Sequence, residues 1–236
     1  MSILLGLLYT KKEMIFIGLF LLELGLLFFF SRLVTYSLSQ LFFRLTRSQN
    51  ATIQLLSFLF LPGIIVHELA HLLVAGLLFV PVGEIEFMPQ IKDGGVKLGS
   101  VAIGKTDPIR RAIIGVAPVF VGLAIILGSL FYLSSAQFVF IPFPWNIIFL
   151  VYILFAIGST MFSSRKDAEG LLEVLIVGAI ILLTLYFIGF RLPEGFANYF
   201  SSNEFTKFVK KANLFMLVPL GIDILIYTVV RMFVKR

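Results

Sequence analysis

The amino-acid sequence predicts an all-α polytopic membrane protein with about six transmembrane helices and a membrane-associated β-hairpin after the second helix. Hydrophobic residues make up 59% of the 236 residues and charged residues only 14%, whereas soluble domains carry roughly a quarter charged residues. Several apolar stretches reach about 18 residues or more, which is long enough to cross a bilayer. One short segment instead alternates polar and apolar residues around glycines, as a β-hairpin does.

The expected spans lie at about 14–31, 52–80, 110–133, 145–162, 170–190 and 213–232. No small-residue cleavage site follows the first apolar stretch, so it is expected to be an anchor and not a cleaved signal peptide. Together with a Ser/Thr/Arg-rich interfacial segment at 31–52, it forms the expected N-terminal region, residues 1–51. A core region follows at 52–175, and the last helices occupy 176–236, with a second interfacial segment at 191–212.

The charge of the chain is best explained by membrane orientation. The net charge is +6, but the basic residues flank the apolar spans and form no stripe, so we expect no nucleic-acid partner. The expected spans divide the 19 Lys and Arg residues into twelve on the side of both termini and seven on the other. This excess predicts a multi-pass protein of a prokaryotic cell membrane with both termini in the cytoplasm.

Residues 82–103 are expected to form the hairpin, with strands at 83–88 and 96–102. Between these strands, Asp93-Gly94-Gly95 supplies the positive φ angles that a tight hairpin turn requires. The first strand alternates Glu84 and Glu86 with apolar residues, which places the two carboxylates on one face. We expect an exposed edge of this hairpin to pair with an extended peptide, and Glu86, Val96 and Leu98 are candidate substrate-contact residues.

The two histidines of the chain lie four residues apart, as His67 and His71, inside the second expected span. Residues i and i+4 share one face of a helix, so both imidazoles can reach one metal ion. Glu68 is adjacent and can take the proton of a water molecule at that ion. Ionisable groups are costly at membrane depth, and a zinc ion accounts for finding three of them together.

A catalytic zinc site has three protein ligands and one open position, so one ligand is still required. The chain has no cysteine and no third histidine, which leaves a carboxylate. Asp167 and Glu169 follow the fourth span on the same side as the histidines, and Glu173 is one turn deeper. The other acidic residues near membrane depth are Glu23, Asp107 and Asp223.

Prolines in two spans predict bends that admit water. Pro62 lacks an N–H and clashes with the carbonyl of Phe58, so the helix is expected to kink about one turn before His67. Gly115 and Pro118 are expected to loosen the third span in a similar way, and both are candidate substrate-contact residues. Irregular backbone at this depth is tolerated beside a cavity, which we interpret as a catalytic cleft.

The run from Pro62 to His71 resembles the zinc-binding helix of the site-2-type intramembrane metalloproteases (peptidase family M50). The run from Ser159 to Gly170 is similar to the second motif of that family, in which an Asp supplies the third zinc ligand, and this match implies Asp167. Gly115-Val116-Ala117-Pro118 resembles the small-residue segment between the two motifs. The expected hairpin is similar to a membrane-associated β-element of these enzymes. This resemblance covers roughly residues 52–175.

The resemblance implies a minimal intramembrane zinc endopeptidase, without PDZ or CBS domains. Its cofactor would be Zn²⁺, held by His67, His71 and Asp167, with Glu68 as the general base. Its partners would be the lipid bilayer and a transmembrane or membrane-inserted peptide substrate. The alternative is a catalytically inactive member of the same fold that serves as a membrane scaffold or partner subunit. The intact Glu68 favours the enzyme, because a scaffold needs no general base.

Overall fold

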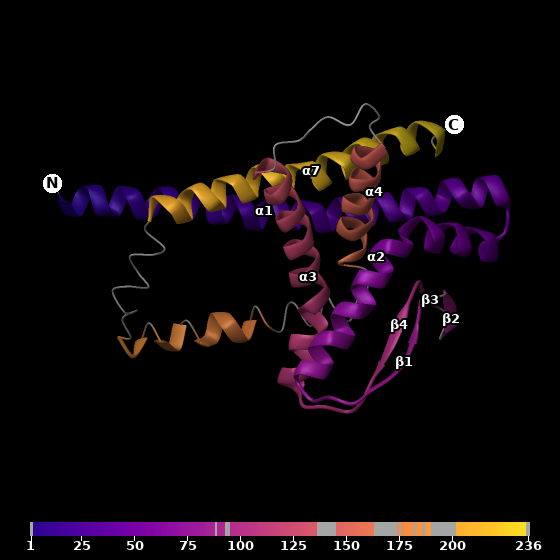
Figure 1. Cartoon of the computed structure of the whole chain (residues 1–236), viewed down its shortest axis with the longest axis horizontal. Coiled ribbons are helices and arrows are strands. Elements are labelled where there is room, and N and C mark those ends of the chain that lie inside the picture. The colour runs from indigo at the N-terminus through magenta and orange to yellow at the C-terminus, as the bar shows by residue number, and fades with distance from the viewer. Residues whose placement is uncertain are drawn as a thin grey trace.

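The computed structural model describes residues 2–87, 89–92, 95–135, 145–162, 174, 176–181, 183–185, 187–189 and 202–234. Its main helices are α1 (Ser2–Thr46), α2 (Gln49–Leu77), α3 (Pro108–Ser135), α4 (Trp145–Thr160) and α7 (Asn203–Val234), as Figure 1 shows. Of these, α1 from Ile15, α2, α3 and α7 are long and apolar enough to cross a membrane. Two further apolar helical stretches, Ile147–Thr160 and Ile176–Leu185, are shorter. The prediction of a mostly helical chain with several helices long and apolar enough to cross a membrane is therefore confirmed, and the number of six spans is not established.

The first helix continues where an interfacial segment was expected. The first helix, α1, is continuous from the expected first span into the expected interfacial segment and ends at Thr46. The hydroxyl groups that made this stretch look interfacial bond back to the carbonyls of the helix itself: Ser31 Oγ donates to Phe28 O at 2.9 Å and Thr35 Oγ1 to Ser31 O at 2.9 Å. Such local bonds satisfy a hydroxyl without breaking a helix.

A tight turn joins α1 to α2. Arg47 has a φ of 52°, in the left-handed region, and its N–H donates to Phe43 O at 2.8 Å. Ser48 then caps α2, its side chain accepting a hydrogen bond from the N–H of Ala51. The second half of α1 therefore lies against the first half of α2, and Val34, Leu38, Leu56 and Phe60 are buried in one cluster there.

The helices α1 and α7 pack side by side and run in the same direction (Figure 1). Near their starts, Asn213 Nδ2 donates to Phe16 O at 3.0 Å, and near their ends, Arg44 donates to Phe233 O at 3.2 Å. The six expected spans would have made the first and last helices antiparallel. The described helices are parallel, and this difference bears on where the two termini lie.

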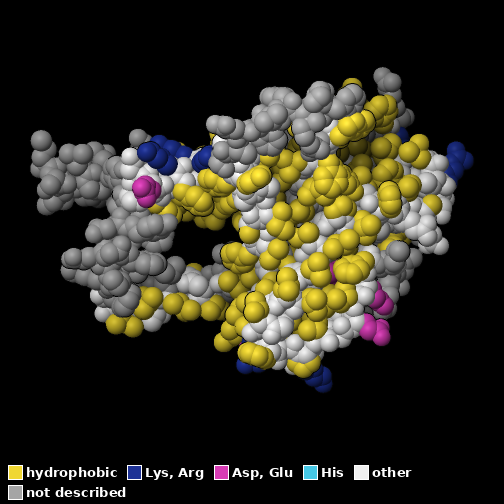
Figure 2. Space-filling model, in the orientation of Figure 1, with side chains coloured by type: hydrophobic (Ala, Val, Ile, Leu, Met, Phe, Trp, Pro, Cys, Tyr) yellow, Lys and Arg dark blue, Asp and Glu magenta, His cyan; other side chains and the backbone are white. Residues whose placement is uncertain are grey.

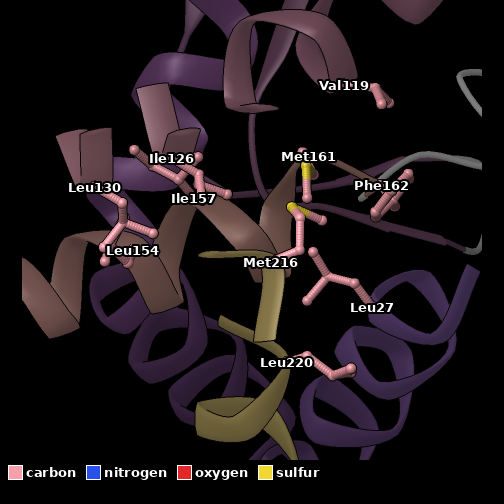
Figure 3. Packing of buried hydrophobic residues seen from close by; sticks show 10 residues of the cluster. All are labelled: Leu27, Val119, Ile126, Leu130, Leu154, Ile157, Met161, Phe162, Met216 and Leu220. Atoms are coloured by element: carbon pink, nitrogen blue, oxygen red, sulfur yellow. The ribbon is translucent and has the colours of Figure 1, made fainter. Parts of the chain in front are cut away.

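The main core lies where α1, α3, α4 and α7 meet. Figure 3 shows its buried side chains, which include Leu27 of α1, Ile126 of α3, Leu154 of α4 and Met216 of α7. Gly63 of α2 lies so close to α4 that an added Cβ would overlap the carbonyl oxygen of Ala156 and the hydroxyl oxygen of Thr160. Small residues permit such close helix packing in membrane proteins.

The predicted hairpin is present as two short antiparallel ladders in succession. Strand β1 (Val82–Glu86) pairs with β4 (Ser100–Ile103), and β2 (Gln90–Lys92) pairs with β3 (Gly95–Lys97). Lys92 lies opposite Gly95, so the reversal of direction falls on the predicted turn, whose residues 93–94 lie outside the described part of the chain. A bulge between Val82 and Ile85 interrupts the first ladder.

The described surface exposes many apolar side chains. Apolar side chains cover most of the described part of the face in Figure 2, whereas the charged side chains lie at its edges. Many large apolar side chains are exposed, including Phe58 and Leu77 of α2 and Phe120 of α3. Exposed apolar area on this scale is typical of a membrane interface. This surface and the four long apolar helices are compatible with an integral membrane protein.

Candidate metal centre

The histidine motif is buried in the second half of α2. His67 is 5% exposed, Glu68 7% and His71 8%. Three elements surround this turn of the helix. Helix α4 packs at Gly63 one turn earlier, and α3 packs at His71. The connection between β3 and β4 lies at Glu68. The motif is therefore enclosed on several sides by other parts of the fold.

The two imidazoles turn the same nitrogen toward each other. Nε2 of His67 and Nε2 of His71 are 3.2 Å apart, and the rings meet nearly at right angles, at 84°. Two nitrogens bonded at about 2.0–2.1 Å to a tetrahedral zinc ion stand about 3.3–3.4 Å apart. The observed spacing therefore fits two corners of a zinc tetrahedron, and imidazole nitrogen is a donor that zinc prefers.

The second nitrogen of His71 is anchored to α3. Nδ1 of His71 lies 2.9 Å from the carbonyl oxygen of Ile114, which can only accept a hydrogen bond. The proton of the neutral ring is therefore on Nδ1, and Nε2 carries the lone pair that a metal needs. Histidines that bind metals almost always donate their other N–H in this way, to a carboxylate, a carbonyl or water.

Without a metal, the same spacing of 3.2 Å fits an N–H···N hydrogen bond between the rings. Because Nε2 of His71 carries no proton, His67 would then have to be the donor. The two interpretations make different demands on the site. A hydrogen bond needs the two rings alone, whereas a metal site needs a third ligand.

The connection between β3 and β4, in the middle of the hairpin, lies directly over Glu68. A Cβ added to Gly99 would be 2.7 Å from Cγ2 of Ile64 and 3.0 Å from Oε1 of Glu68. Only a residue without a side chain permits so close an approach between backbone and helix. Leu98, next to it, is partly buried against the cluster that contains Ile64. The hairpin therefore reaches the carboxylate that was predicted to be the general base.

No third ligand is found among the residues that the structure describes, which contain no group of three or more His, Cys, Asp or Glu side chains placed to hold a metal ion. The expected ligand Asp167 and the alternatives Glu169 and Glu173 lie outside the described residues. The ligand set that was predicted from sequence therefore stays a prediction.

The other carboxylates that the sequence offered have roles elsewhere. Asp107 is exposed and caps α3: its Oδ1 accepts a hydrogen bond from the N–H of Arg110 at 2.9 Å, and its Oδ2 lies 3.3 Å from Nε of Arg110. The Arg110 N–H holds the pKa of the Asp107 carboxyl below its ordinary value. Asp223 of α7 accepts a hydrogen bond from Ser159 Oγ of α4 at 3.2 Å, and Glu23 is buried in α1.

The candidate substrate-contact residues fall into two groups. Gly115 and Pro118 lie on α3 beside and one turn beyond Ile114, and Pro118 is fully buried. Glu86 is the last residue of β1, and it accepts a hydrogen bond from Ser100 at 3.3 Å. Leu98 follows β3 and is partly buried against the cluster that contains Ile64 of α2. Val96 is in the outer ladder, opposite Ile91.

Two residues at the site were not predicted from the sequence. The atom of Ile114 that contacts His71 is its backbone carbonyl oxygen, so the type of its side chain gave no indication of this role. Pro118, four residues later, could have indicated a carbonyl without a helical hydrogen bond. Gly99 was treated only as part of a strand region. A glycine inside a strand pattern often marks close approach of another backbone or side chain, which is the signal that could have identified it.

Comparison with known proteins adds no name to this geometry: no protein-family model, no curated protein and no solved structure matches the chain. The function of the chain must therefore be inferred from the residues of the site and their surroundings.

Proposed function

We propose that the chain is an intramembrane zinc endopeptidase of the site-2 type, which hydrolyses peptide bonds of transmembrane or membrane-inserted substrates. The observation that carries this proposal is the pair of Nε2 atoms, 3.2 Å apart and buried beside Glu68 on an apolar helix. Three ionisable side chains together at membrane depth are rare outside functional sites. Their spacing and order are those of a zinc-binding helix with an adjacent general base.

The residues of the chain have distinct parts in this reaction. His67 and His71 would hold a zinc ion through Nε2, and Asp167 is the proposed third ligand. A bound zinc ion supplies Lewis acidity, which makes water more acidic and polarises a carbonyl oxygen. Glu68 takes a proton from the attacking water and transfers it to the leaving amine. The enclosed position of Glu68 strengthens its electrostatic effect because the surrounding dielectric constant is low.

The hairpin is the proposed means of presenting the substrate. A transmembrane helix hides its carbonyls in hydrogen bonds and must be extended before attack. The outer edge of a strand can bind an extended peptide through main-chain hydrogen bonds. Gly99 lies close to Glu68 and directly precedes β4. A peptide paired along the edge of the hairpin near the start of β4 would therefore lie near the proposed base. The bilayer is the second proposed partner, in contact with the apolar surface in Figure 2.

The proposed membrane arrangement takes account of the parallel pair α1 and α7. If both cross the membrane, they start on the same side, so the number of crossings is odd and the two termini lie on opposite sides. Five crossings, by α1, α2, α3, α4 and α7, replace the six expected from sequence. This arrangement places thirteen of the 19 Lys and Arg residues on the side of the N-terminus and six on the other side, a larger excess than before. The six are Arg32, Arg44, Arg47, Arg231, Lys235 and Arg236.

Zinc content and turnover together test the proposal. Parent protein and the Glu68→Gln and His67→Ala variants are purified in detergent and analysed for metal by mass spectrometry. Hydrolysis of a reconstituted single-span peptide with a helix-breaking residue is then followed. We expect zinc in the parent and in Glu68→Gln but not in His67→Ala, with turnover only in the parent. Removal of a general base slows such reactions by about 10²–10⁴-fold.

Replacement of zinc by Co²⁺ adds a readout that does not depend on knowing the substrate. Tetrahedral Co²⁺ absorbs visible light strongly, so the parent and Glu68→Gln should show these bands and His67→Ala should not. A parent protein that binds neither Zn²⁺ nor Co²⁺ would refute the endopeptidase and leave the scaffold as the better proposal.

A further inference from the structure

The tautomer of His71 is fixed by a backbone group on another helix. Nδ1 of His71 donates to the carbonyl oxygen of Ile114 over 2.9 Å, and the ring is 8% exposed. The carbonyl lies in the first half of α3, which begins at Pro108. In an uninterrupted α-helix, this carbonyl would accept the N–H of the residue four positions later. Its availability to His71 therefore needs an explanation.

That explanation is Pro118, the residue four positions after Ile114. Proline has no N–H, so the helical hydrogen bond to Ile114 O cannot form, and the proline ring pushes against the same carbonyl. Pro118 is fully buried, and His71, which donates to this carbonyl, is buried as well. A buried carbonyl that has lost its helical donor to proline needs another donor, and the buried His71 supplies it.

We propose that Pro118 is a positioning residue for the metal site. By leaving Ile114 O without a helical donor, it reserves this oxygen for Nδ1–H of His71. The imidazole is thereby held in the Nδ1–H tautomer, with the lone pair of Nε2 directed at Nε2 of His67, 3.2 Å away. The significance of this role for metal binding rests on the proposed function, but the tautomer itself does not.

The other helical prolines show that a kink alone does not account for this arrangement. Pro62 of α2 and Pro219 of α7 also interrupt apolar helices. Pro219, like Pro118, is fully buried, and it releases the carbonyl of Phe215, which lies far from the histidine pair in sequence and on another helix. Pro219→Ala is therefore a matched control for Pro118→Ala: it is the same change, equally buried, and away from His71.

The first test measures the tautomer in metal-free protein. Because the chain has only two histidines, nitrogen-15 NMR of histidine-labelled protein resolves them. The parent and Pro219→Ala should show His71 with its proton on Nδ1. Pro118→Ala restores an N–H that competes for Ile114 O and straightens the helix, so the Nε2–H form should become populated. A parent with the proton on Nε2, or a Pro118→Ala variant with an unchanged tautomer, would overturn the inference.

The second test separates positioning from folding. An alanine is far better tolerated than proline inside a helix, so Pro118→Ala should unfold at the same or a higher denaturant concentration than the parent. Its affinity for Zn²⁺, measured by competition with a chelator, should nevertheless fall by about 10–100-fold, as when outer partners of ligating histidines are lost. Equal zinc affinities of the two proteins would refute the positioning role.

A third variant tests the absent N–H directly. Replacement of residue 118 by lactic acid, introduced as an α-hydroxy acid, gives the side chain of alanine with an ester in place of the amide. It has no N–H and no proline ring. We expect this variant to retain the Nδ1–H tautomer that Pro118→Ala loses. If it instead behaves like Pro118→Ala, the missing donor is not the cause. If no variant binds zinc but these tautomers hold, the inference stands and the proposed enzyme does not.

Discussion

Replacement of Gly63 by alanine is expected to force α2 and α4 apart. The added Cβ would overlap both the carbonyl oxygen of Ala156 and the hydroxyl of Thr160, and the first of these is backbone that cannot rotate away. Thr160 itself donates to Ala156 O at 2.8 Å, so its hydroxyl is held in place. Overpacking of this kind costs about 1–3 kcal/mol.

Gly76 provides a matched control on the same helix. An added Cβ there meets nothing within 4 Å, so Gly76→Ala gains only the helical preference of alanine, about 1 kcal/mol. Because both variants gain this helical preference, their free energies of unfolding should differ by the overpacking cost alone, about 1–3 kcal/mol. Reversible unfolding in mixed micelles, followed by circular dichroism, measures this difference.

The same pair of variants links packing to the site. Gly63 lies one turn before His67, so movement of α2 away from α4 would also displace the histidines from α3. We expect Gly63→Ala to bind zinc more weakly than Gly76→Ala. Equal stability of the two variants would refute the close helix contact from which these expectations are derived.

Two further predictions concern the hairpin and the membrane arrangement. Gly99→Ala should displace Glu68 or Ile64 and lower turnover, while zinc content stays at the parental level. The control is Gly83→Ala, which is crowded against Ala102 in the same hairpin but lies away from Glu68. Equal turnover of the two variants would contradict the contact between Gly99 and Glu68. Single cysteines added at residues 2 and 236 of this cysteine-free chain should react with an impermeant maleimide from opposite sides of sealed vesicles, and labelling of both from one side would refute the five-crossing arrangement.

The elements that sequence predicted well are those whose signal is local. The long apolar runs predicted the long apolar helices, and the alternation around Asp93-Gly94-Gly95 predicted the hairpin and the place of its turn. At residues 31–46, where serines and threonines were interpreted as part of an interfacial segment, the structure continues α1. The hydroxyls of Ser31 and Thr35 bond to carbonyls of α1 itself, and Ser31 and Ser37 are buried. A polar residue indicates a membrane boundary only when its hydrogen bonds must go to water.

The parallel packing of α1 and α7 could not be predicted from the chain alone. A count of apolar stretches gives possible crossings, but it does not show which stretches cross and which are too short. Contacts between residues about 190 positions apart, such as Arg44 with Phe233, fixed the direction of α7 relative to α1. Such contacts depend on how all the intervening elements pack, and no local pattern encodes them.

By itself, the sequence predicted long apolar helices and placed the two histidines on one face of such a helix, with Glu68 next to His67, because helical periodicity and hydrophobicity are local properties. Only the tertiary structure decided what surrounds that turn: Ile114 O behind His71, Gly99 over Glu68 and Ala156 beside Gly63. Each of these contacts joins segments that are distant along the chain. They exist because close packing of helices and hairpin brings specific backbone atoms within reach of the site.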